Sequence, residues 1–297
     1  MPLLEIDTLV RRFGEVTALD GVSFSVEPGQ LTGFVGANGA GKTTTMRIVM
    51  GVLSPSSGEV RWEGRPISRE DRRRFGYMPE ERGLYPKQGV LEQLVFFARL
   101  HGLSRASATT AARDLLERLG LAARAGDRLA TLSLGNQQRV QIAAALVHEP
   151  AALVLDEPFS GLDPLAVDAM ADLLRDQVAR GVPVLFSSHQ LDLVERLCDH
   201  VVILRGGRIA AEGSVDELRR SGGVRHRLVL APGSDAAWVR EHSGLRVHRV
   251  EGASALVEVT EPGAEQALLS EAVRRGAVEE FGPVLPALAE LFREVAE

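Results

Sequence analysis

Apolar and polar residues alternate along this chain with two periods, and these periods predict its strands and helices. Residues 3–35 contain short strand-like runs separated by turn signals such as Asp20-Gly21, which is typical of a small antiparallel sheet. Apolar runs at residues 151–155, 182–187, 201–205 and 208–212 predict strands, the last two joined as a hairpin. Helical periodicity marks residues 44–52, 90–101, 106–119, 134–148 and 164–180. Strands that alternate with helices predict an α/β fold with a parallel-rich core sheet.

The pattern changes near Ser221-Gly222-Gly223, which predicts a domain boundary. We expect a first domain over residues 1–220, with a helical subdomain at about 85–135, and a second domain over residues 224–297. In the second domain, strands at 227–230, 245–250, 255–260 and 278–281 alternate with helices at 236–241 and 264–275. This β-α-β-β-α-β order predicts a small α+β domain of ferredoxin-like type, followed by a closing helix over residues 284–295.

Composition narrows the classes of protein to consider. The 297 residues suffice for about two domains, and the net charge of −6 argues against a nucleic-acid partner. A single cysteine, Cys198, excludes a disulfide framework and a cysteine zinc site, as expected in a reducing cytosol. The N-terminus lacks the pattern of a signal peptide, and no run of 18 apolar residues occurs. We therefore expect a cytoplasmic protein whose membrane role, if it has one, depends on a partner.

The stretch after the apolar run at residues 30–35 fits the phosphate-binding pattern G-x-x-x-x-G-K-[ST]. It comprises Gly36, Ala37, Asn38, Gly39, Ala40, Gly41, Lys42, Thr43 and Thr44. Glycines let the backbone curl around an anion, so that amide groups and a helix N-terminus face the phosphates. Lys42 would reach the β- and γ-phosphates, and the Thr43 hydroxyl would bind Mg²⁺. A glycine-rich turn without a ligand is the weaker interpretation, and we expect this P-loop to bind a nucleoside triphosphate.

A second apolar strand ends in two carboxylates, Asp156 and Glu157, directly before Pro158. In a P-loop fold such a strand lies beside the phosphate loop, so Asp156 would hold the Mg²⁺ shell. Glu157 lies one residue further, where it would orient the attacking water or accept its proton. A surface acidic pair is the alternative, which the preceding apolar run disfavours.

The segment before that strand resembles the Leu-Ser-Gly-Gly-Gln signature of the ATP-binding subunits of ABC transporters. Its sequence is Leu132-Ser133-Leu134-Gly135-Asn136-Gln137-Gln138-Arg139, which departs from the signature at Leu134 and Asn136. In that family the signature opens a helix and contacts the γ-phosphate of ATP on the other subunit, again an anion at a helix N-terminus. The resemblance therefore implies that Ser133, Gly135 and Asn136 bind ATP in trans.

Three further positions match the same family in order. Ser160-Gly161-Leu162-Asp163 resembles the D-loop, which lies across the dimer interface, so Asp163 is implied to act in trans. His189 follows the strand at residues 182–187, where the family has a switch histidine that contacts the γ-phosphate and positions Glu157 and water. Phe13 matches the aromatic residue that stacks on adenine, although a core aromatic is an equally good interpretation.

Glu80 is the clearest departure from the family, which has glutamine at the end of the strand leading to the helical subdomain. A carboxylate still offers an oxygen ligand to Mg²⁺, while it adds repulsion toward the γ-phosphate. Residues 75–85 as a whole resemble exporter ATPases that pair with ABC-2 type membrane subunits and often carry a C-terminal extension. The resemblance implies export, with Glu80 as a candidate metal ligand.

Taken over residues 3 to about 220, the resemblance implies a P-loop NTPase fold of the ABC nucleotide-binding type, with antiparallel and helical subdomains. It implies hydrolysis of ATP, with Mg²⁺ as cofactor, by a homodimer or by a pair of ABC subunits. A separate integral membrane permease subunit would hold this dimer at the inner face of the membrane. A soluble, non-transport ABC ATPase that acts as a regulator is the alternative. DNA-repair and translation types are disfavoured, because the chain lacks their coiled coils, zinc cysteines and second nucleotide domain.

Overall fold

The computed structural model describes residues 4–81, 83–221 and 223–291. Its contacts divide the chain into two compact units, Met1–Ser214 and Val215–Glu297. The boundary expected between residues 220 and 224 stays a prediction. None of the helices in the described ranges has the length and apolarity that crossing a bilayer requires.

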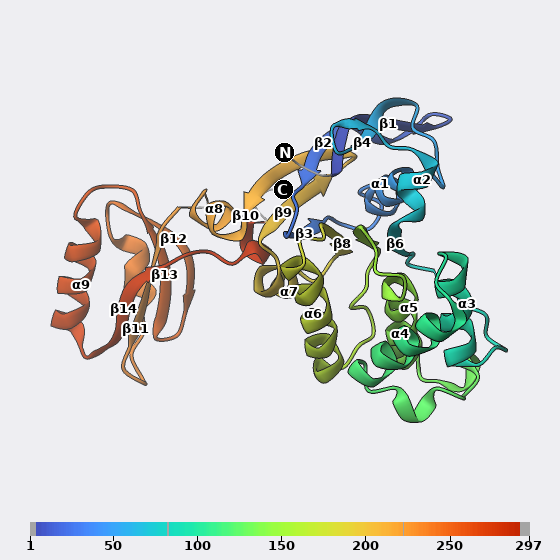
Figure 1. The fold of residues 1–297 in the computed structure, drawn as a ribbon. Coiled ribbons are helices and arrows are strands. Elements are labelled where there is room, and N and C mark those ends of the chain that lie inside the picture. The colour runs from blue at the N-terminus through green and yellow to red at the C-terminus, as the bar shows by residue number, and fades with distance from the viewer. Residues whose placement is uncertain (1–3, 82, 222, 292–297) are drawn as a thin grey trace. The chain divides into compact units, whose positions relative to one another are not determined.

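A six-stranded sheet forms the centre of the first unit, in the order β10-β9-β3-β8-β7-β6 (Figure 1). Its strands are β3 (Leu31–Val35), β6 (Phe75–Met78), β7 (Ala152–Leu155), β8 (Val184–Ser188), β9 (His200–Arg205) and β10 (Arg208–Ser214). All neighbours pair in parallel except β9 and β10, which form the predicted hairpin. Strands β3, β7 and β8 are completely buried, which is why their sequences are mostly apolar and lack the alternation of a half-exposed strand.

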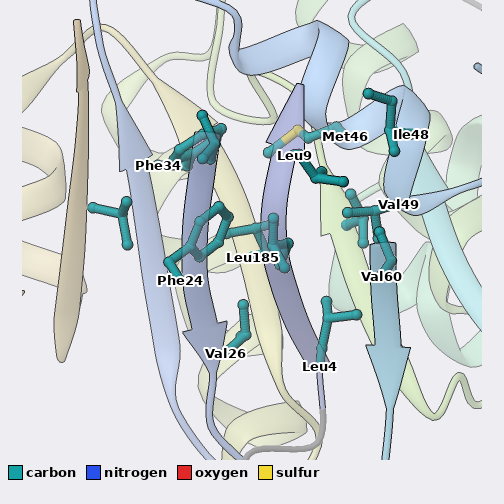
Figure 2. Packing of buried hydrophobic residues seen from close by; sticks show 14 of the residues in the cluster. Leu4, Leu9, Phe24, Val26, Phe34, Met46, Ile48, Val49, Val60 and Leu185 are labelled. Carbon is teal, nitrogen blue, oxygen red and sulfur yellow. The ribbon is translucent and has the colours of Figure 1, made fainter. Parts of the chain in front are cut away.

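A four-stranded antiparallel sheet packs on this core in the order β2-β1-β4-β5. It consists of β1 (Leu4–Phe13), β2 (Val16–Val26), β4 (Ser57–Trp62) and β5 (Arg65–Pro66), as the early alternation predicted. Figure 2 shows its inner side chains meeting β3, β8 and helix α1 (Lys42–Val49). The rings of Phe24 and Phe34 stack 5.0 Å apart at this junction. The cluster fixes the position of the strand that carries the P-loop.

Four of the remaining described helices of the first unit follow the predicted periodicity with small shifts at their ends, whereas the short helices over residues 69–73 and 191–197 were not among the predicted elements. The remaining helices are α2 (Arg69–Arg73), α3 (Val90–Leu100), α4 (Arg105–Arg118), α5 (Leu134–Leu146), α6 (Pro164–Ala179) and α7 (Leu191–Leu197), with 3-10 turns η1 (Ala122–Arg124) and η2 (Leu129–Thr131). Helices α3, α4 and α5 gather into one helical region (Figure 1). Ser104 caps α4, because its side chain accepts from the amide of Ser107.

The second unit is an antiparallel sheet in the order β12-β13-β11-β14, with α9 (Ala264–Arg275) packed on one face. Its elements are α8 (Val215–Ser221), β11 (Arg225–Leu230), η3 (Ala237–Glu241), β12 (Leu245–Glu251), β13 (Ser254–Val259) and β14 (Val278–Val284). The predicted α+β domain is confirmed, with a 3-10 turn in place of its first helix. The start of the closing helix was wrong: Val284 pairs with Arg225 in the sheet, and helix begins at Leu288, after Pro286. Residues 292–295 of the predicted helix lie outside the described residues.

Candidate nucleotide-binding site

Four neighbouring parallel strands end at the same edge of the central sheet, and each delivers one part of the predicted site. The P-loop follows β3, His189 follows β8, Asp156 and Glu157 follow β7, and Glu80 lies two residues beyond β6. Because β3, β8, β7 and β6 are adjacent in that order, segments far apart in sequence lie side by side. Ligands of open α/β sheets bind at the carboxyl ends of the strands, so this edge is the expected place for the site.

A cavity of about 230 Å³ lies at this edge. It is lined by Ala18, Asn38, Gly39, Ala40, Gly41, Lys42, Thr43, Thr44, Glu80, Asp156 and Glu157. Nine of these eleven come from the predicted phosphate loop or its carboxylate partners Asp156 and Glu157. The cavity therefore brings together residues that the sequence placed more than a hundred positions apart.

Two glycines of the loop are required by close backbone contacts. Gly41 has a φ of 113°, and a Cβ there would lie 2.6 Å from a methyl group of Leu19 and 2.8 Å from the carbonyl oxygen of Ala18. A Cβ on Gly36 would lie 2.5 Å from the carbonyl oxygen of Leu204. Only glycine fits both positions, so the loop can curl tightly and lead straight into α1, whose N-terminal amides face the cavity side of the loop.

The ammonium group of Lys42 is held inside the loop that precedes it. Its Nζ donates to the carbonyl oxygen of Gly36 over 2.7 Å, and a weaker contact of 3.4 Å reaches the carbonyl oxygen of Ala37. The Lys42 residue is 7% exposed, so its positive charge is largely withdrawn from water. An anionic ligand in the cavity would meet a positioned charge rather than a mobile one.

Asp156 has one carboxylate oxygen with a hydrogen bond and one without. Its Oδ1 accepts from the hydroxyl of Ser187 over 2.5 Å, whereas Oδ2 is buried and has no hydrogen-bond partner among the described residues. A buried carboxylate oxygen without a partner is costly, and a cation or its water would relieve that cost. The donor set at Asp156 thus fits a hard divalent cation such as Mg²⁺.

Glu157 and His189 are in direct contact. Nδ1 of His189 lies 2.9 Å from Oε2 of Glu157, and the Glu157 side chain is 13% exposed while that of His189 is 54% exposed. Glu157 adopts a positive φ of 51°, which is uncommon for a residue with a side chain. The pair joins the ends of β7 and β8, so a water between the cavity and this carboxylate would have an acceptor already oriented for it.

Glu80 and Thr43 both line the cavity, as a metal role would require. Glu80 is exposed, and within the described ranges no three acidic, histidine or cysteine side chains are grouped closely enough to hold a metal by themselves. A metal here would complete its shell with phosphate and water, as Mg²⁺ commonly does. Next to the site, burial raises the pKa of Tyr77, and the negative charge of Asp156 adds to that rise.

The signature segment forms the N-terminus of α5, away from this cavity. Ser133 caps the helix, with its Oγ 3.4 Å from the amide nitrogen of Asn136. Neither Ser133, Gly135 nor Asn136 is among the described residues that line the cavity. Asp163 caps α6 through the amide of Ala166 and also pairs with Arg139. These are local structural contacts, and the roles of the four residues in trans stay predictions.

Phe13 lies at the end of β1, and the residue is 47% exposed. The guanidinium carbon of Arg11 lies 4.5 Å from the ring centroid, so one face of the ring is covered by a cation. The exposure argues against a core aromatic. Stacking on adenine stays a prediction, because Phe13 is not among the described residues that line the cavity.

Two residues of this site were missed from the sequence. Ser187, in the β8 strand, links Asp156 to the backbone of Glu157, whose amide donates to its hydroxyl over 2.8 Å. Gln138, on α5, donates to the carbonyl oxygens of Glu157 and Pro158. A signal for both residues was present in the sequence: each is polar at a position that the apolar pattern of its strand or helix places in the interior.

Comparisons with known proteins agree with this geometry. The family described as ABC transporter matches residues 19–160, and the family described as ATP-binding protein DrrA1-3-like, C-terminal domain, matches residues 213–296. The uncharacterized ABC transporter ATP-binding protein YhaQ of Bacillus subtilis is 35% identical over 98% of both chains. The Nod factor export ATP-binding protein I of Paraburkholderia xenovorans is 39% identical over 84% of this chain and 82% of that one. A solved ATP-binding subunit of an ABC transporter is similar with a TM-score of 0.69 at 36% identity, covering 74% of this chain and 93% of that chain.

Proposed function

Because this chain belongs to the family of ABC transporter ATP-binding proteins, we propose that it hydrolyses ATP as one half of a dimer and drives export through a separate membrane subunit. The family binds and hydrolyses ATP to power transport, and export proteins are among the relatives of this chain. A soluble regulator is not favoured, because these relatives are named as transporter or export proteins and match this chain over most of their length.

The observation that carries the hydrolytic assignment is the contact between His189 and Glu157, a residue that lines the P-loop cavity. In this proposal the carboxylate of Glu157 orients the attacking water and accepts its proton. His189 keeps that carboxylate in place and reaches toward the γ-phosphate. Both groups come from strand ends, so their separation is fixed by the sheet rather than by a flexible loop.

The phosphates of ATP would be bound by the loop amides and by Lys42, whose ammonium group already lies in the loop. Thr43 and Asp156 would hold Mg²⁺, with Glu80 as a further oxygen ligand on the open side of the cavity. The bound cation would neutralise charge that develops on the phosphate oxygens during transfer. Phe13 would stack on the adenine.

A dimer follows from how the two halves of the predicted site are distributed. The cavity of one chain holds the P-loop and both carboxylates, while Ser133, Gly135 and Asn136 cap a helix elsewhere on the same unit. In a head-to-tail pair each α5 N-terminus would complete the partner's site, since a helix N-terminus favours the γ-phosphate. Asp163 would lie at the same interface.

The membrane subunit would dock on the helical region and so hold the chain at the inner face of the cytoplasmic membrane. Tyr85 and Phe96 are 49% and 45% exposed there, so this region offers apolar area for such a contact. Beside them lies a hollow of about 350 Å³ whose lining includes Tyr77, Leu84 and Phe97. Because Tyr77 belongs to β6 and Glu80 follows the same strand, movement of this surface would reach the nucleotide cavity.

Complementation between two inactive variants tests the dimer. Lys42→Ala removes the P-loop charge, and Ser133→Arg blocks the α5 N-terminus. Each variant alone should hydrolyse ATP slowly. An equal mixture should recover about a quarter of the wild-type sites, because half of randomly paired dimers are mixed and each mixed dimer holds one intact site. A mixture no more active than its components would contradict the shared site. Mixing Lys42→Ala with a chain that combines Glu157→Gln and Lys42→Ala provides the concentration control, because every dimer in that mixture lacks an intact P-loop.

A further inference from the structure

The backbone of Glu157 is held at both of its polar groups by side chains from other elements. Its amide donates to the hydroxyl of Ser187 over 2.8 Å, and its carbonyl oxygen accepts from Nε2 of Gln138 over 3.0 Å. The same Nε2 lies 3.2 Å from the carbonyl oxygen of Pro158. A residue with a positive φ persists only where its surroundings determine it, and these bonds are such surroundings.

Gln138 is well suited to this task. It is 8% exposed and lies on α5, the helix that Ser133 caps five residues earlier. Its amide group therefore spans from the signature helix to Glu157 and Pro158, just beyond the end of β7. Because the contact is buried, removing the donor would leave two carbonyl oxygens without that partner.

Further contacts tie the start of α5 to the segment after Glu157. Arg139 pairs with Asp163 over 3.1 Å, and a Cβ on Gly135 would lie 3.2 Å from the carbonyl oxygen of Gly161. The glycine thus allows close approach of the two backbones. Together with Gln138, these contacts make the N-terminal half of α5 and residues 157–163 one connected piece.

We propose that Gln138 is a positioning residue that holds the Glu157 backbone from the signature helix, so that hydrolysis in a chain's own P-loop depends on where its α5 lies. The inference rests on the proposed role of Glu157. In the shared-site dimer, α5 of one chain contacts ATP bound by the partner, while Glu157 serves the chain's own ATP. Gln138 therefore links the occupancy of one site to the alignment of the hydrolytic carboxylate in the other.

The variant Gln138→Met tests this link, since methionine has similar length and flexibility but no donor. We expect kcat for ATP to fall by about 10- to 100-fold with little change in KM, because misplacement of a catalytic group affects turnover more than ground-state binding. Gln138→Asn keeps the donor on a shorter arm and should give an intermediate kcat. The cooperativity of the ATP concentration curve should also decrease, as the two sites would no longer be linked.

Gln177→Met is the matched control. Gln177 is 7% exposed on α6, near the end of the helix opposite to Asp163, and makes no described side-chain contact with Glu157. This variant should keep kcat and the cooperativity, even where its melting temperature falls as much as that of Gln138→Met. Equal losses of kcat in the two variants would overturn the proposal, since burial of a polar side chain would then explain both.

A double-mutant cycle separates this inference from the function on which it rests. If Gln138 acts through Glu157, adding Gln138→Met to Glu157→Gln should not lower the residual rate further. Full turnover by Glu157→Gln would contradict the proposed function itself. A Glu157→Gln protein without turnover, together with an unchanged kcat in Gln138→Met, would overturn only the positioning role.

Discussion

Nδ1 of His189 and Oε2 of Glu157 lie 2.9 Å apart, although their residues are 32 positions apart in the chain. With Nδ1 donating to the carboxylate, Nε2 of a neutral ring carries a lone pair, and it becomes a donor only when the ring is doubly protonated. The contact thus holds the side chain of Glu157, a residue that lines the nucleotide cavity. It is the relationship on which the hydrolytic account depends.

Removal of the imidazole should therefore slow turnover more than binding. We expect His189→Ala to lower kcat by about 100-fold or more, in the range found for loss of a group that assists proton transfer, while ATP binding changes little. Steady-state ATPase rates and titration with a fluorescent ATP analogue measure the two effects. His200→Ala is a control, because His200 pairs with Glu212 at the start of β9. A large loss of ATP affinity in His189→Ala would contradict the assignment.

Glu80 offers a test of the metal shell. If its carboxylate binds Mg²⁺, Glu80→Gln should shift the Mg²⁺ dependence of hydrolysis modestly, because an amide oxygen remains, and Glu80→Ala should shift it more. Both variants and the wild type are assayed over a Mg²⁺ series without the membrane subunit. Three superimposable curves would remove Glu80 from the metal site and leave it, at most, as a residue of the docking surface.

The chemistry of the site could be predicted because phosphate binding imposes fixed spacing on neighbouring residues. Asp156 and Glu157 directly follow one buried strand, and the phosphate loop that leads to Lys42 follows another. A parallel sheet brings such strand ends together. Gln138 could not be given a role in this way. Its partners are backbone carbonyls 19 and 20 residues away, and the sequence does not show which polar position of a helix faces them.

The differences in the elements have similar causes. The predicted closing helix began too early because Val284 completes a strand whose partner, β11, lies more than fifty residues before it. Local periodicity does not contain that pairing. Helix α1 begins at Lys42 rather than at residue 44, because the amide of Thr45 already bonds to the carbonyl of Gly41. The phosphate loop and the helix are thus one continuous structure.

A pH prediction follows from the stacked rings of His101 and His148, which lie 3.7 Å apart. Burial, and to a lesser extent the nearby His101, lowers the pKa of His148 to about 4. The unfolded chain therefore binds more protons between the ordinary histidine value of about 6.5 and 4, so folding stability falls as the pH drops through that window. His148→Gln should flatten the decline. Urea unfolding of the wild type and of His148→Gln at pH 7, 6 and 5 measures how the free energy of unfolding depends on pH. Parallel declines in the two proteins would contradict a lowered pKa of His148.

The C-terminal unit should not be needed for ATP binding. All described residues that line the nucleotide cavity lie within the first unit, and a hydrophobic cluster separate from its core stabilises the second. A chain that ends at residue 221 should fold and bind a fluorescent ATP analogue with an affinity close to that of the full chain. Circular dichroism confirms folding. A folded truncate that does not bind nucleotide would show that residues beyond 221 complete the site.

The most direct test of the central claim is the behaviour of Glu157→Gln with ATP and Mg²⁺. The substitution keeps the size of the side chain and its contact with His189 but removes the proton acceptor. ATP should still bind and close the dimer, and turnover should nearly stop. Size-exclusion chromatography with light scattering, at saturating ATP and micromolar protein, should then show a stable dimer for this variant and a monomer without nucleotide. A monomer in the presence of ATP, or ATP hydrolysis at the wild-type rate, would contradict the account.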